Sequence, residues 1–187
     1  VIFNPFSNTL SAGPTLRSGQ NEATWVKLPG DCIITVDQCS TTSERYLQGF
    51  GWLPDANVPV ALYGNGCEVG AGVLLPNGKV FFLGGTQNTA LYTPSPSGPF
   101  YFGTWAGGPT IPNGQAAPDA PAAMMVNGKI LCAVSPFATG TNSPFTSPTS
   151  FFEYDYTIGG AGAFTQVSGP TGLTLSGRTY PMRMLDL

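Results

Sequence analysis

Three acidic side chains, those of Glu22, Glu68 and Asp119, are candidates for ligand binding, because each stands at a matching place just before a run of apolar residues. Carboxylates that converge could bind a cation, since hard oxygen ligands suit Ca²⁺, or they could bind the hydroxyls of a sugar. Alternatively, each acid accepts backbone N–H bonds from a neighbouring unit and holds the fold together. Spacing alone does not decide between the two, so we take all three as candidate binding residues.

Two basic side chains, Arg45 and Arg178, complete the candidate binding set. A guanidinium can grip a carboxylate ligand through two parallel hydrogen bonds. The chain has only seven basic and ten acidic residues, which favours pairing of these arginines, and of Arg183, with acids of neighbouring units.

Aromatic residues and one polar loop offer further contacts. Trp52 and Trp105 could stack on sugar rings, although their repeated positions favour a structural role. The stretch 138–148 is rich in Ser, Thr, Pro and Asn. Insertions on rigid scaffolds often carry binding, so this stretch is either a partner contact or a passive surface loop.

The composition excludes several classes of function. Because the chain has no histidine, these residues cannot form serine–histidine nucleophilic machinery. The four cysteines match no zinc spacing. We therefore assign no catalytic residue, no metal site and no cofactor. The net charge of −3 without a basic patch argues against nucleic acid as a partner. No apolar run approaches the roughly 18 residues of a membrane span.

The elements that position these residues are short strands. The 25 glycines and 18 prolines, together with 12% aromatic residues, indicate many turns around a packed core, which is typical of an all-β domain. Three units repeat an acidic residue, an apolar run, a glycine turn and a second apolar run. Their glycines, Gly30, Gly78 and Gly128, lie 48 and 50 residues apart. Asn precedes two of them, and Asn-Gly between apolar runs predicts a hairpin with a type I′ turn.

A second pair of strands follows each hairpin. Tyr46, Tyr92 and Tyr154 mark the third strand, whereas Trp52, Trp105 and Phe164 mark the fourth. A period near 50 with four strands per unit is typical of kelch repeats.

The second repeat carries a family resemblance. Leu83-Gly84-Gly85, then Tyr92, then Trp105 resembles the order of residues in bacterial-type kelch-repeat proteins and, more distantly, in the propeller of the galactose and glyoxal oxidases. The first and third repeats lack the double glycine. The resemblance implies an all-β, kelch-type β-propeller, with about four four-stranded blades of a six- or seven-bladed ring.

The repeat also predicts boundaries for a partial chain. We expect residues 1–16 to end one blade, complete blades at 22–56, 68–110 and 119–168, and the first strand of another blade at 177–187. The remainder of the propeller would come from the same or another chain.

The cysteines lead to one structural hypothesis, which rests on the propeller topology. Cys39 falls between the second and third strands of one repeat, and Cys67 precedes the first strand of the next, so both lie on one face. They could form a disulfide in an oxidising compartment. Cys132 lies within an apolar run and is expected to be a buried small hydrophobe.

Two classes of function compete. The first is a non-catalytic, extracellular or cell-surface binding or scaffold propeller that engages a protein or a glycan. The second, implied by the resemblance, is a copper radical oxidase whose metal ligands lie outside these residues. A structural subunit of a surface assembly is a third alternative, since open strand edges can pair between chains. We favour the binding propeller.

Overall fold

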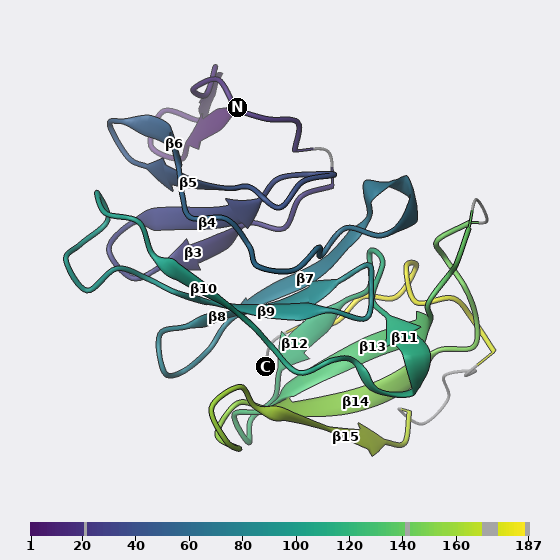
Figure 1. Cartoon of the computed structure of the whole chain (residues 1–187). Helices are drawn as coiled ribbons and strands as arrows, with labels where there is room; N and C mark the ends of the chain where they lie inside the picture. Colours follow the sequence, from purple (N-terminus) through teal and green to yellow (C-terminus); the bar gives the residue numbers. More distant parts are fainter. Residues whose placement is uncertain (21, 141–142, 170–175, 186–187) are drawn as a thin grey trace.

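The computed structural model describes residues 1–20, 22–140, 143–169 and 176–185. Its strands form three successive antiparallel sheets, preceded by a small hairpin (Figure 1). The hairpin pairs β1 (Ile2–Asn4) with β2 (Thr9–Ser11). The first sheet consists of β3 (Val26–Leu28), β4 (Cys32–Val36), β5 (Ser43–Leu47) and β6 (Gly51–Pro54). The second consists of β7 (Val69–Leu74), β8 (Val80–Gly84), β9 (Thr89–Thr93) and β10 (Thr104–Gly107).

The third sheet has one additional short strand. It contains β11 (Gln115–Ala116), β12 (Ala122–Met124), β13 (Ile130–Pro136), β14 (Ser150–Asp155) and β15 (Ala163–Val167). Both β11 and β12 pair with β13. Two short 3₁₀ turns, η1 (Asn65–Cys67) and η2 (Pro112–Gly114), lie outside the sheets. No helix among the described residues is both long and apolar enough to cross a membrane.

The second sheet lies between the other two and buries a different set of side chains on each face. Val80 and Phe82 of β8 join the core shared with the first sheet. Phe81 and Leu83, which alternate with them, join the core shared with the third sheet, because successive side chains of a strand point to opposite faces. The Phe81 ring stacks on that of Tyr154, with centroids 3.8 Å apart. The two cores therefore hold the three sheets face to face.

The repeat predicted from the sequence appears as equivalent strand pairs. Each expected tyrosine faces its aromatic partner across neighbouring strands: Tyr46 pairs with Trp52, Tyr92 with Trp105 and Tyr154 with Phe164. The expected ranges 22–56, 68–110 and 119–168 each contain a run of four consecutive paired strands. Aromatic pairs opposite each other stabilise a sheet by filling the space above it.

The turn chemistry differs from the prediction at the Asn-Gly sites. Gly78 and Gly128 have φ of 81° and 80°, but the asparagines before them do not have positive φ, so the turns are not type I′. Gly78 N–H donates to Leu75 O, and Leu75 N–H donates to Lys79 O. This pattern is typical of a three-residue loop in which a type I turn is followed by a left-handed glycine. Pro76 at the first loop position favours the negative φ that this turn requires.

The strand expected within 177–187 is also absent. The described residues 176–185 contain no strand, and residues 186 and 187 lie outside the described part of the chain. Pro181 has no N–H to donate to a ladder. Met182 N–H instead closes a turn on Thr179 O, and the Tyr180 ring contacts that of Phe145.

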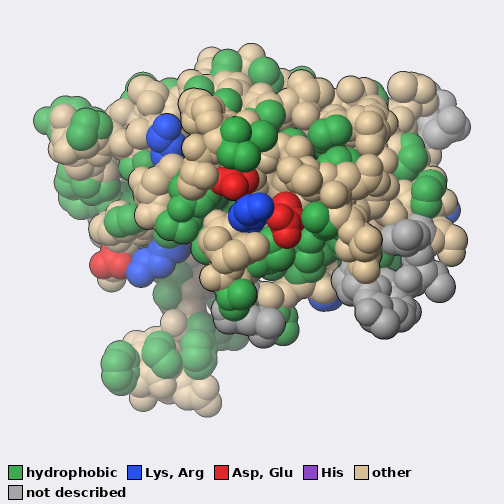
Figure 2. Space-filling model, turned by 90° about the horizontal axis from the view of Figure 1, so that it is seen from below, with side chains coloured by type: hydrophobic (Ala, Val, Ile, Leu, Met, Phe, Trp, Pro, Cys, Tyr) green, Lys and Arg blue, Asp and Glu red, His purple; other side chains and the backbone are tan. Residues whose placement is uncertain are grey.

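The exposed surface agrees with the low charge of the sequence. Figure 2 shows one face of the molecule, on which charged side chains are few and lie among hydrophobic and uncharged polar groups. The β1–β2 hairpin is exposed along both strands, including Phe3, which is 55% exposed.

Candidate functional site

Strands β3, β7 and β12, the first strands of the three runs of four consecutive paired strands, lie side by side, and this arrangement builds the candidate site. Both β3 and β12 contact β7. The Thr24 hydroxyl, just before β3, donates to Gly70 O at 2.9 Å. From the other side, Asp119 N–H donates to Val69 O at 3.0 Å. These bonds bring the beginnings of three strands together at one end of the molecule.

Glycines fix the backbone of Glu68 at the start of β7. Gly64 N–H donates to Glu68 O at 2.8 Å, and Gly85 N–H donates to Leu62 O at 2.7 Å. A Cβ added to Gly85 would lie only 2.1 Å from Glu68 O. The double glycine of the second repeat therefore permits a backbone approach that no other residue allows.

The three predicted carboxylates meet at this position. Ligand oxygens of Glu22, Glu68 and Asp119 all lie within 4.8 Å of one another. Glu22 and Asp119 have φ of 59° and 49°, in the left-handed region that side chains other than glycine rarely adopt. A strained backbone at two of three converging acids is a pattern found at functional sites. The three acids, one from each sheet, are therefore close enough for one ligand to contact all of them.

Like charges and burial alter the protonation of these acids. The pKa of Glu68 is raised to about 7, first by burial and then by the negative charge of Asp119 and by Glu22. Burial and the charge of Glu22 also raise the pKa of Asp119. One oxygen of Glu68, Oε2, is buried without a hydrogen-bond partner. The cluster thus exchanges a proton near neutral pH, and its oxygens are of the type that binds cations or sugar hydroxyls.

An open cavity of about 580 Å³ lies over two of these acids. Glu22 and Asp119 line it, whereas Glu68 is not among the lining residues. The lining also includes Phe145, Tyr180 and Arg183. The Arg183 guanidinium is held by its own segment, since Nη1 donates to Tyr180 O at 3.0 Å and to Met182 O at 2.6 Å. The cavity therefore combines carboxylates, a guanidinium and two aromatic rings.

Arg45, predicted as a binding residue, lies elsewhere and is buried. Its Nε lies 2.5 Å from Oδ2 of Asp55, and both side chains are almost inaccessible. Its Nη1 also donates to Pro99 O and, at 2.9 Å, to Tyr101 O, both in the loop between β9 and β10. Arg45 thus links the first sheet to the second through these two carbonyl groups, and it does not reach the cavity. Its acidic partner, Asp55, belongs to the same expected unit (22–56) as Arg45, and not to a neighbouring unit as the sequence had suggested.

The other candidates divide between structure and surface. Arg178 is exposed and is not among the residues that line the cavity. Trp105 packs on Phe82 and Tyr92, and its Nε1 donates to Ser43 Oγ at 3.1 Å. Trp52 is 8% exposed. Both tryptophans are therefore placed for packing rather than for stacking on a ligand.

The polar stretch 138–148 contributes one residue to the cavity. Phe145 lines it and contacts the ring of Tyr180, with centroids 4.6 Å apart. Asn65 Nδ2 donates to Ala138 O at 3.4 Å and to Gly140 O, which fixes the near end of the loop. Residues 141 and 142 lie outside the described part of the chain.

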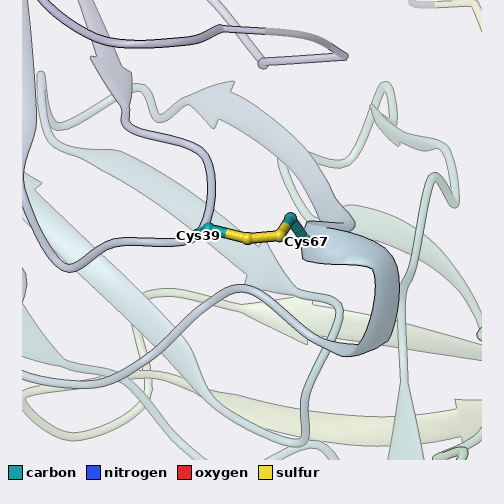
Figure 3. The surroundings of a disulfide bond; sticks show 2 residues. All are labelled: Cys39 and Cys67. Carbon is teal, nitrogen blue, oxygen red and sulfur yellow. A yellow bond between two sulfur atoms is a disulfide. The ribbon is translucent and has the colours of Figure 1, made fainter. Parts of the chain in front are cut away.

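Cys39 and Cys67, proposed above to form a disulfide, are bonded to each other (Figure 3). Their Cα atoms are 4.8 Å apart, within the usual range for this bond. The bond joins the β4–β5 loop to η1, and so ties the first sheet to the residue that precedes Glu68. Cys32 and Cys132 are free and buried.

Sequence reasoning missed the aromatic side of the cavity. The repeat predicts a strand at Tyr180, and Phe145 belongs to the polar stretch 138–148, which the sequence leaves as a partner contact or a passive surface loop. Both come together only because residues 176–185 turn back toward the third sheet, where Thr149 Oγ1 donates to Gly177 O at 2.7 Å. No local signal in the sequence specifies that contact.

Comparisons with known proteins bear on the fold. No family model and no curated protein matches the chain. Among solved structures, selenomethionine-substituted virginiamycin B lyase from Staphylococcus aureus aligns at 11% identity and a TM-score of 0.58, over 94% of this chain and 49% of that one. A catalytically inactive variant of that lyase with quinupristin aligns at 12% identity and a TM-score of 0.44, over 83% of this chain and 58% of that one.

The chain thus spans about half the length of the first of these structures. Virginiamycin B lyase is a β-propeller, and at this identity the likeness concerns the fold alone. Together with the four-stranded antiparallel sheets, it identifies the chain as all-β with a β-propeller arrangement.

Proposed function

We propose that the chain belongs to a non-catalytic propeller that binds a protein or a glycan outside the cell, and that the ligand occupies the cavity beside Glu22 and Asp119. One observation carries the proposal. Three first strands bring three carboxylates within 4.8 Å of one another, next to an open cavity of about 580 Å³. A cavity of this size suits a small ligand or part of a larger one.

The chemistry of the lining supports a ligand with several hydrogen-bond donors. Carboxylate oxygens accept hydrogen bonds from hydroxyl or ammonium groups. Tyr180 and Phe145 add apolar ring surface to the lining, and aromatic rings pack well against sugar rings or side chains. A glycan, or an exposed protein loop with basic and hydroxyl groups, could contact both the carboxylates and the aromatic rings of the lining.

Two further features support the finer details of the proposal. The Cys39–Cys67 disulfide is of the kind that persists in oxidising surroundings, such as those outside the cell. The Gly84-Gly85, Tyr92 and Trp105 pattern, now with a packing reason for each residue, supports a kelch-type propeller with six or seven blades when complete.

The test is a binding screen with matched variants. The protein is applied to an array of neutral, acidic and basic oligosaccharides and to a panel of immobilised peptides, and the hits are measured again with Asp119→Asn and Glu68→Gln. Asn tolerates the left-handed backbone at position 119. We expect at least tenfold weaker binding in both variants, and unchanged binding in Glu153→Gln, whose carboxylate pairs with Lys129 on the third sheet. Hits that bind both cavity variants as tightly as the wild type would refute the proposed site.

A further inference from the structure

Two more carboxylates, those of Asp37 and Glu44, lie on the face of the first sheet that points away from the second sheet. Thr35 pairs with Glu44 across β4 and β5, and Asp37 N–H donates to Thr42 O at 2.9 Å. Asp37 and Glu44 are therefore diagonal neighbours on one face, because side chains two residues apart on a strand point the same way. They are 5% and 1% exposed. Two acids are thus buried together on a face of the sheet.

Each acid has one satisfied and one unsatisfied oxygen. Asp37 Oδ2 accepts from the Thr42 hydroxyl at 2.5 Å, and Glu44 Oε2 accepts from Arg17 N–H at 3.3 Å. The other two oxygens, Asp37 Oδ1 and Glu44 Oε1, are buried and have no hydrogen-bond partner. One proton placed between these two oxygens would satisfy both, and it would remove one of two like charges that are costly to bury.

The face that carries this pair is covered by a short segment, residues 14–20, which we call the strap. Besides Arg17, the strap provides Gln20, whose Oε1 accepts from Trp25 Nε1 at 2.8 Å. Pro14 lies beside Gly51, the first residue of β6. Most strap residues are exposed. The strap is therefore attached to the first sheet mainly by the hydrogen bond from Arg17 N–H to Glu44. The contacts of the strap with Trp25 and Gly51 add to this attachment.

We propose that Asp37 and Glu44 share one proton and that this proton holds the strap on the first sheet, so that the strap docks at low pH and is released as the pH rises. The charged group that faces Glu44 within the described residues is Asp37. The strap contributes the Arg17 N–H and the Ser18 hydroxyl. Arg45, next to Glu44 on β5, projects to the opposite face and is neutralised there by Asp55.

The direction of the pH dependence follows from the pair. Burial, and then the charge of Asp37, raise the pKa of Glu44, while hydrogen bonds from Ser18 and from Arg17 N–H oppose them. A raised pKa means that the docked state holds a proton that the free chain has lost. Docking is strongest below the pKa that the pair has in the released state, and it weakens by up to about tenfold for each pH unit between that value and the raised pKa of the docked state. Above the docked-state pKa, docking no longer changes with pH. This device is independent of the ligand proposed for the cavity.

Trypsin, which cleaves after Arg17, measures strap release directly. The variant Glu44→Gln has an amide that donates to Asp37 Oδ1 and an amide oxygen that accepts from Arg17 N–H, with no proton to lose. At pH 8 we expect trypsin to cut the wild type at Arg17 at least tenfold faster than Glu44→Gln, and the ratio to narrow toward one as the pH is lowered. Asp37→Asn should behave like Glu44→Gln, and Glu153→Gln like the wild type.

Two results would overturn the proposal. In the first, Arg17 is cut at equal rates in the wild type, Glu44→Gln and Asp37→Asn at every pH. In the second, a chelator such as EDTA accelerates cleavage of the wild type at Arg17, which would show that a cation rather than a proton lies between the two acids. Should Glu44→Gln fail to fold, Asp37→Asn alone decides between these outcomes.

Discussion

The Tyr92 hydroxyl donates a 2.7 Å hydrogen bond to Oδ2 of Asp55, across the junction between the first and second sheets. Gly103 N–H donates to the other carboxylate oxygen of Asp55 at 3.0 Å. The same carboxylate pairs with the buried Arg45. The Asp55 carboxylate thus accepts hydrogen bonds from a tyrosine hydroxyl and a backbone amide, and it pairs with a guanidinium. Two of these three contacts link it to the second sheet and its β9–β10 loop.

Asp55→Ala should destabilise the protein strongly, because it leaves the Arg45 charge buried without a partner. Breaking a buried pair from one side costs about 3–5 kcal/mol, and losing a single hydrogen bond to a charged group costs about 1.5–3 kcal/mol. Tyr92→Phe should therefore lower the free energy of unfolding by much less than Asp55→Ala does. Urea unfolding of both variants measures the two losses. Equal and small losses for the two variants would mean that the pair is hydrated rather than buried.

Gly85→Ala should be destabilising because the new Cβ would meet Glu68 O at 2.1 Å. A backbone contact of this kind cannot be relieved by a side-chain rotation, so we expect a loss of about 1–3 kcal/mol or more. Gly160→Ala is the matched control, since nothing lies within 4 Å of a Cβ built there. Thermal unfolding of the two variants measures the difference. A wild-type melting temperature for Gly85→Ala would contradict the close approach of these two segments.

The disulfide should contribute about 3 kcal/mol, because it closes a chain separation of 28 residues and restricts the unfolded state. Replacing Cys39 and Cys67 together by Ser should lower the free energy of unfolding by that amount. Alkylation followed by mass measurement should modify no thiol in the native protein and two after denaturation, from the buried Cys32 and Cys132. Four modified thiols in denaturant without a reductant would show that the bond is absent.

Stability should fall as the pH rises past the ordinary pKa of 4.5 toward about 7, because folded Glu68 keeps its proton over that interval. In this window the native state binds more protons than the unfolded state, and raising the pH therefore favours unfolding. Solvent in the open cavity screens the effect, and we expect a fall in Tm of about 2–4 °C, corresponding to about 1 kcal/mol. Because Glu44 titrates in the same direction, the measurement is the difference between the wild type and Glu68→Gln. Identical pH profiles for the two proteins would count against a raised pKa at Glu68.

Much of the fold could be predicted from the sequence because its signals are local. The spacing of Gly30, Gly78 and Gly128 and the recurring tyrosines depend on turns and strand pairs within about 50 residues, and the strands pair accordingly. The predicted type of the Asn-Gly turns was wrong. Each loop has three residues rather than two, and Pro76 favours the type I turn with which the first of these loops begins. The strand expected at 177–187 does not form in the described part of that range, 177–185, because these residues turn back onto the third sheet instead.

The candidate site was predictable in part for a physical reason. Glu22, Glu68 and Asp119 could be found because each occupies the same place in its repeat. The distances between the three carboxylates could not be predicted, because they depend on how closely β3 and β12 approach β7. That approach is set by packing between sheets. Phe145 and Tyr180 belong to no repeat, so their place in the cavity followed only from the structure.

The three sheets converge so that three carboxylates lie within 4.8 Å of one another. The most direct test is a carboxyl ¹³C NMR titration of Glu68 in the wild type and in Asp119→Asn. Convergence predicts a pKa of about 7 for Glu68 in the wild type, and a lower pKa once the neighbouring charge is removed. A Glu68 that titrates near 4.5 in both proteins would contradict it.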